Sequence, residues 1–83
     1  MTINWGDYLG NNHLKVLPAY VGKFTKLTYL GLSDNKLCTL PESIGSLSEL
    51  ETLWLDENQL QVLPESFCNL ESLKDLSLDY NNL

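Results

Sequence analysis

The chain has 83 residues, including 19 leucines, 11 acidic residues, 5 lysines and no arginine, which give it a formal net charge of −6. This length allows one small domain at most, and no run of 18 apolar residues that could span a membrane is present. Because binding to phosphate backbones or anionic lipid needs clustered cations, the composition argues against nucleic acid and membranes as partners and favours a protein with a basic surface.

The first eight residues show strand periodicity. Met1, Ile3 and Trp5 alternate with polar residues, which predicts a short strand. We expect residues 1–8 to form a cap-like segment at the start of a single domain that spans residues 1–83. This segment lacks the basic stretch and the apolar stretch that mark a secretory signal peptide.

The rest of the chain repeats itself every 23 residues. Residues 27–49 read LTYLGLSDNKLCTLPESIGSLSE, and residues 50–72 read LETLWLDENQLQVLPESFCNLES. A degenerate copy spans residues 4–26, and a truncated copy spans residues 73–83. Repetition at this period predicts a solenoid, in which each copy forms one coil and stacks on its neighbours.

Each copy predicts one short strand and about one turn of helix. Leu30 and Leu32 lie two residues apart, so they point to the same side of a strand. Asn35 follows at a bend, where its amide can satisfy backbone groups that the bend leaves unpaired. Pro41 suits the first turn of a helix, and Ile44 and the leucine three residues after it would share one helical face.

The pattern LxxLxLxxNxLxxLPxxxxxLxx resembles the leucine-rich repeat (LRR) in its 23-residue intracellular form, as found in Scribble, erbin and Ras-suppressor-type scaffold proteins. The resemblance covers Leu9 to Leu83. It implies an α/β solenoid shaped as a short curved horseshoe, with a parallel β-sheet on the concave face and short helical or 3-10 segments on the convex face. It also implies a non-catalytic module that binds proteins through the concave face and needs no cofactor.

The first copy departs from this pattern at its inward positions. Asn4 stands where Leu27 stands in the next copy, and Asp7 stands where Leu30 stands. We therefore expect the interior of the first coil to be open to water.

Residues that flank the strand leucines should form the concave face, with side chains of neighbouring coils about 4.8 Å apart. Trp54 either anchors an interface or packs over Gly31 of the neighbouring coil. The acids either steer a basic partner towards the aromatics or form a solvated face that keeps the solenoid soluble. The predicted partner-binding residues are Tyr8, Tyr29, Trp54, Asp56, Asp79 and Tyr80.

The last copy supplies a strand and its bend and then stops, which leaves the end of the coil uncovered. Solenoids need capped ends, so either the chain belongs to a longer solenoid or the end pairs with a second copy. An isologous contact of this kind would give a homodimer. This is the alternative function, a self-associating structural unit, and its contact residues are Leu73, Leu76, Leu78 and Leu83.

Asp56 and Asp79 occupy the same position in adjacent copies, which makes carbohydrate binding or hydrolysis a remote alternative. A wide, shallow face lacks the pocket that raises the pKa of a catalytic carboxyl group, and calcium needs 6–8 converging oxygen ligands. His13 stands at a polar loop position without a second histidine to form a zinc site. We predict no catalytic, cofactor or metal site.

Cys38 and Cys68 lie at different positions of their repeats. We expect no disulfide between them, and two cysteines cannot form a disulfide framework. This usage favours a reducing, cytoplasmic compartment.

Overall fold

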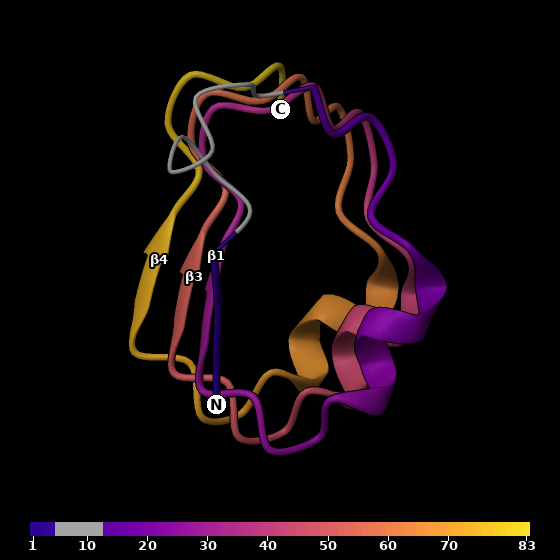
Figure 1. Ribbon diagram of the computed structural model, residues 1–83. Coiled ribbons are helices and arrows are strands. Elements are labelled where there is room, and N and C mark those ends of the chain that lie inside the picture. Colours follow the sequence, from indigo (N-terminus) through magenta and orange to yellow (C-terminus); the bar gives the residue numbers. More distant parts are fainter. Residues whose placement is uncertain (5–12) are drawn as a thin grey trace.

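The computed structural model describes residues 1–4 and 13–83 and shows a solenoid with a sheet on one side and helices on the other (Figure 1). In these residues the strands form a single parallel sheet in the order β1-β2-β3-β4. The strands are β1 (Thr2–Asn4), β2 (Tyr29–Gly31), β3 (Thr52–Trp54) and β4 (Asp75–Ser77). The helices, all of the 3-10 type, are η2 (Ala19–Lys23), η3 (Glu42–Ser46) and η4 (Glu65–Asn69). This confirms the predicted fold class.

The strand register from β2 onward follows the sequence repeat. Leu30 pairs with Leu53, and Leu53 pairs with Leu76, so each strand lies beside the equivalent residues of the next coil. Equivalent side chains therefore form columns across the sheet, and each inward leucine column is continuous from coil to coil.

The first strand uses a different register from the one that the repeat predicted. Ile3 pairs with Leu30, and Asn4 pairs with Gly31, whereas the 23-residue spacing would place Asp7 and Tyr8 at these positions. Ile3 packs against the hydrophobic core, and an apolar side chain can fill this position without the desolvation penalty of a carboxylate. The 23-residue spacing therefore does not predict the residue that pairs with Leu30, whereas the alternation of the first residues did predict a short strand here. Asp7 itself lies outside the described residues.

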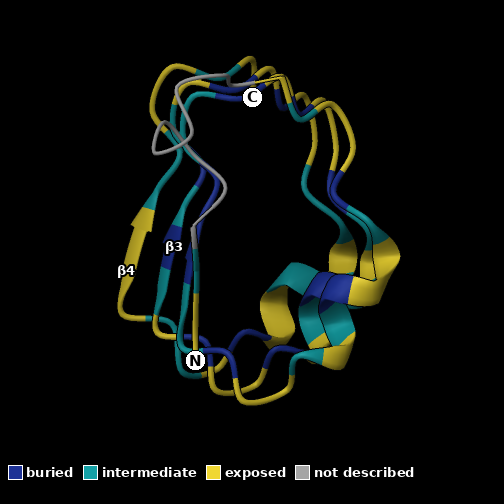
Figure 2. Cartoon of the chain, viewed as in Figure 1, coloured by how far each residue is buried: buried dark blue, intermediate teal, exposed yellow. Residues whose placement is uncertain are grey.

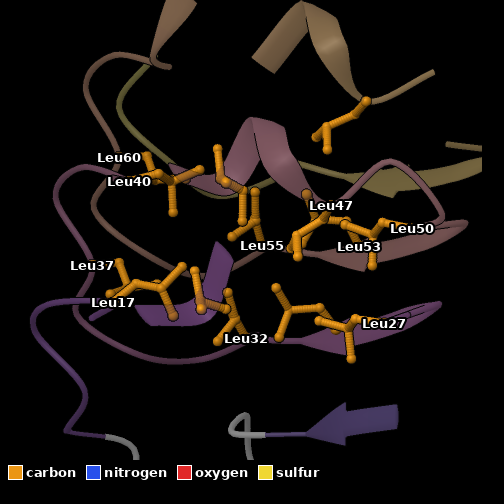
Figure 3. Close-up of a cluster of buried hydrophobic side chains, with 14 residues drawn as sticks. Leu17, Leu27, Leu32, Leu37, Leu40, Leu47, Leu50, Leu53, Leu55 and Leu60 are labelled. Atoms are coloured by element: carbon orange, nitrogen blue, oxygen red, sulfur yellow. The ribbon is translucent and has the colours of Figure 1, made fainter. Parts of the chain in front are cut away.

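Leucine side chains fill the space between the sheet and the helices (Figure 3). Burying each one stabilises the fold by about 1.5–3 kcal/mol. Figure 2 shows that the buried residues belong mainly to the inner coils, which have a neighbour on both sides. The fully buried residues, with no accessible surface, are Val21, Leu27, Leu30, Leu32, Leu37, Ile44, Leu47, Leu50, Leu53, Leu55 and Leu60.

A buried asparagine joins each coil to the one before it. The Asn58 amide nitrogen donates to the Leu32 carbonyl of the preceding coil at 2.9 Å and to the Leu55 carbonyl of its own coil at 3.0 Å. Its amide oxygen accepts from the Leu37 backbone N–H at 3.1 Å. Asn81 makes the equivalent contacts one coil later. The amides thus replace backbone hydrogen bonds that the bend cannot make.

The residue before each of these asparagines adopts a left-handed backbone conformation. Asp34, Glu57 and Tyr80 have φ values of 58°, 58° and 60°. This conformation costs a non-glycine residue about 1 kcal/mol or more. It turns the backbone N–H of Glu57 towards the next coil, where it donates to the Asp79 carbonyl at 2.9 Å.

The 3-10 helices stack through contacts between glycine and serine. A Cβ atom added to Gly45 would lie 2.6 Å from both the Cβ and the carbonyl oxygen of Ser66, and Gly22 meets Ser43 in the same way. The Ser66 hydroxyl donates to the Glu42 carbonyl at 2.6 Å across this contact. Neighbouring helices can approach this closely only because glycine has no side chain.

Replacing Asn58 by alanine should lower the free energy of unfolding by about 1–3 kcal/mol, because the buried Leu37 N–H loses its acceptor, whereas the Leu32 carbonyl still accepts from Asn35. Asn82→Ala is the matched control, since Asn82 is exposed. Urea denaturation followed by circular dichroism measures both. Equal stability of the two variants would show that the asparagine contacts contribute nothing.

Gly45→Ala should destabilise the fold by about 1–3 kcal/mol, because its new methyl group collides with Ser66. Cys68 occupies the same repeat position in η4 and is exposed, so Cys68→Ala should leave stability unchanged. Thermal unfolding of the two alanine variants tests this. A Gly45→Ala protein as stable as the wild type would mean that the helices separate at little cost.

Candidate protein-binding surface

The side of the sheet that faces away from the helices, here called the sheet face, carries the non-leucine residues of the strands. Because side chains alternate along a strand, the residues on either side of each buried leucine point away from the core. Tyr29 and Thr52 lie side by side at one end of the strands, and both are half-buried.

Trp54 lies in the middle of the sheet face. It pairs with Gly31 on one side and with Ser77 on the other. Trp54 is half-buried, and Gly31 is buried although it has no side chain of its own. The neighbouring glycine leaves room for the indole ring over the sheet, and part of the Trp54 surface stays accessible to a partner.

The end of the sheet face near the bends is acidic. Asp56 accepts a hydrogen bond from the Ser33 hydroxyl at 2.6 Å, which orients its carboxylate across the coil boundary. Asp79 occupies the same position in the next coil and is exposed. The acids of the sheet face and of the bends directly after it are Asp34, Asp56, Glu57, Asp75 and Asp79. None of the described positions on this surface holds a lysine, so its charge is wholly negative.

Lysines pair with acids away from the sheet face. Lys26 lies 3.3 Å from Glu49, and Lys74 lies 3.7 Å from Glu51, both in the segments that precede the strands. These exposed pairs contribute little to stability. They do, however, pair Lys26 and Lys74 with acids that lie outside the acidic surface.

The predicted aromatic residues do not all come together. Tyr80 follows β4 at the bend and is 79% exposed, which makes it the most exposed large apolar residue described. Tyr29 lies at the opposite end of its strand from Asp56 and Asp79, in the same row of the sheet as Thr52 and Asp75. Tyr8, which was also predicted to contact the partner, lies outside the described residues, and the residue that pairs with Gly31 is Asn4.

The exposed leucines belong to the last coil. Leu76 is 40% exposed and Leu83 is 59% exposed, whereas the equivalent Leu53 and Leu60 are fully buried. Leu73 and Leu78, which complete the predicted self-association set, are half-buried.

The sequence of residues 7–83 matches the family model described as a leucine-rich repeat region. The chain belongs to the leucine-rich-repeat family. The solved structure of an LRR protein from Leptospira interrogans is similar to it, with 44% sequence identity and a TM-score of 0.83. The match covers 86% of this chain but only 18% of the Leptospira chain. Comparison with curated proteins gave no match.

LRR proteins are typically non-enzymatic modules that mediate protein–protein interaction. Of the two acids singled out for carbohydrate chemistry, Asp56 accepts the Ser33 hydroxyl and Asp79 is exposed. The residues described here contain no group of three or more potential ligands for a metal ion.

Other residues singled out in the LRR sequence lie apart from the sheet face. His13 is exposed, and Cys38 and Cys68 are exposed free thiols. No helix within residues 1–4 and 13–83 is long and apolar enough to cross a membrane. The cytoplasmic localisation stays a prediction.

The sequence analysis did not predict the left-handed backbone conformation of the residue before each bend asparagine. Asp34, Glu57 and Tyr80 share one repeat position and one φ value, yet they differ in charge and size. Glycine or asparagine would have signalled this conformation in the sequence, and neither is present at these positions.

Proposed function

We propose that this LRR domain binds a protein partner with a basic surface through its sheet face. The supporting observation is that the described positions of that face carry several acids and no lysine, beside the half-buried Trp54. Complementary charge steers a partner into contact, and a large aromatic side chain supplies buried area once contact is made. The described residues proposed to contact the partner are Tyr29, Trp54, Asp56, Asp79 and Tyr80.

Rigidity favours this function. The strands are fixed by parallel pairing on both sides of β3, and the Asp56 carboxylate is held by the Ser33 hydroxyl. A surface whose side chains are already ordered loses little conformational entropy when it binds. Backbone spacing also fixes the distance between Asp56 and Asp79, so the surface favours partners whose cations match it.

Trp54→Ala should weaken binding of a partner isolated with the wild-type domain by about 2 kcal/mol, or roughly thirtyfold. Tyr20→Ala is the control, because Tyr20 is 54% exposed on η2, away from the sheet face. Titration calorimetry at two salt concentrations should also show weaker binding at high salt.

Two results would contradict this proposal. Binding that Tyr20→Ala abolishes and Trp54→Ala leaves intact would place the contact on the helix side. A Trp54→Ala domain that no longer unfolds cooperatively would show that the indole ring serves packing over Gly31.

Self-association through the last coil is the second candidate function, and the exposure of Leu76 and Leu83 favours it. Charge opposes it. Two β4 strands pairing antiparallel about Ser77 would place Asp75 of each copy opposite Asp79 of the other, and like charges directly opposite destabilise a strand pair.

We expect a monomer in light scattering on a sizing column across micromolar concentrations, because four carboxylates would meet in such a dimer. A dimer that Leu76→Lys dissociates, and that Val62→Lys leaves intact, would instead support self-association. Val62 is a fair control because it is 60% exposed and lies outside the last strand.

A further inference from the structure

Trp54 and Asp56 lie side by side in the coil of β3, which has a neighbouring strand on each side. They are two residues apart, so both side chains point away from the helices. Alternate residues of a strand are about 6.6 Å apart, which places an indole ring next to a carboxylate on the sheet face. Both residues keep their neighbours in the coils of β2 and β4, whatever covers the last strand.

The indole ring of Trp54 has small residues on both sides. Trp54 pairs with Gly31 in β2 and with Ser77 in β4. Gly31 is buried although it has no side chain, and the Trp54 ring beside it is large enough to cover it. Trp54 itself is only half-buried, and no cation among the described residues lies over its ring. The π electrons give the accessible face of the ring a partial negative charge, which attracts cations.

The Asp56 carboxylate turns towards the coil of β2. The Ser33 hydroxyl donates to its Oδ1 at 2.6 Å, and Ser33 follows Gly31 by two residues in that coil. This is the side on which Trp54 pairs with Gly31. The ring and the carboxylate are therefore neighbours along the strand and also across the coil boundary.

The Asp56 carboxylate keeps both its charge and its ability to accept hydrogen bonds. Its two oxygens offer about four acceptor sites, of which the Ser33 hydroxyl uses one. Lys26 and Lys74 pair with acids outside the sheet face, and no described lysine pairs with Asp56. Asp79 occupies the same position in the next coil and adds a second negative charge about 4.8 Å away.

A guanidinium group matches this pair of neighbours better than an ammonium group. Guanidinium is planar and weakly hydrated, so it stacks on an aromatic ring while its N–H groups point outward in its own plane. Those N–H groups can form two parallel hydrogen bonds to one carboxylate. An ammonium group is a compact, strongly hydrated point charge, which gains little from a ring and a carboxylate that lie side by side.

We propose that Trp54 and Asp56 form a recognition site for an arginine side chain of the partner protein. The guanidinium group stacks on the indole ring and donates to the Asp56 carboxylate, which the Ser33 hydroxyl holds in place. This inference rests on the proposed function, the binding of a basic partner by the sheet face, and it specifies which cation is recognised there. Asp79 strengthens the negative charge beside the site.

Three blocked peptides test this proposal, namely Gly-Ser-Arg-Ser-Gly and its variants with lysine or citrulline in the middle. Citrulline has nearly the shape of arginine but no charge. Each peptide is titrated into the isotopically labelled full chain, and nuclear magnetic resonance follows the Trp54 indole N–H and the Gly31 backbone amide. The arginine peptide should bind about fivefold more tightly than either variant. Its arginine methylene protons should shift upfield, because stacking places them over the ring.

Two variants of the domain separate the contributions of the ring and the carboxylate. Trp54→Leu keeps an apolar side chain beside Gly31 and should abolish the preference for arginine over lysine, measured at the Gly31 amide. Asp56→Asn keeps an acceptor oxygen for the Ser33 hydroxyl and should weaken arginine binding about fivefold. Glu65→Gln is the matched control, because it removes one charge from η4, away from the sheet face, and should leave binding unchanged.

Equal binding of the arginine and lysine peptides at Trp54 would overturn the arginine site while leaving a basic partner on the sheet face. Equal weakening by Asp56→Asn and Glu65→Gln would overturn it too, since the attraction would then come from net charge alone. So would the absence of any change at Trp54 and Gly31 with all three peptides. Failure of the proposed function is a different result, in which Trp54→Ala leaves the affinity for the isolated partner unchanged.

Discussion

The buried asparagine at each bend is the interaction on which the rest of this LRR domain depends. Asn58 accepts from the Leu37 N–H of the preceding coil, which would otherwise be buried without a partner, and donates to the Leu32 carbonyl, which also accepts from Asn35. Leaving a buried polar group unpaired costs about 1–3 kcal/mol, a large share of the stability of a domain this small. Coils can therefore stack in only one register, the one that brings each amide opposite these groups.

A fixed register turns the chemical pattern of one repeat into columns on the surface. The glycine of β2 and the tryptophan of β3 become neighbours, and Asp56 comes within hydrogen-bonding distance of Ser33. No single repeat holds an acidic surface, but three stacked repeats make one. The same regularity means that each inner coil presents the same backbone groups to the next.

The two ends of the solenoid differ from its inner coils because each end has only one neighbour. At the amino end, the pairing of β1 with β2 departs from the 23-residue spacing, and Ile3 lies beside Leu30. At the carboxyl end the leucines keep their spacing but not their burial, since Leu76 is 40% exposed where Leu53 is fully buried. Identical residues in the same motif thus have different roles, and only the presence or absence of a neighbouring coil separates them.

The sequence by itself determined the coil period, the inward leucines, the asparagine at the bend and the fold. It could do so because every inner repeat has the same neighbours, so the spacing of residues within one repeat is enough to predict which of them are buried. Tertiary structure alone decided the β1 register, the half-burial of Trp54 and the left-handed conformation at Asp34, Glu57 and Tyr80. The β1 register follows from the gain in burying an isoleucine rather than a carboxylate. The left-handed conformation accompanies the bend of every described coil, including the last, where the Tyr80 N–H has no partner among the described residues. Glu57 and Tyr80 are not residue types that predict it.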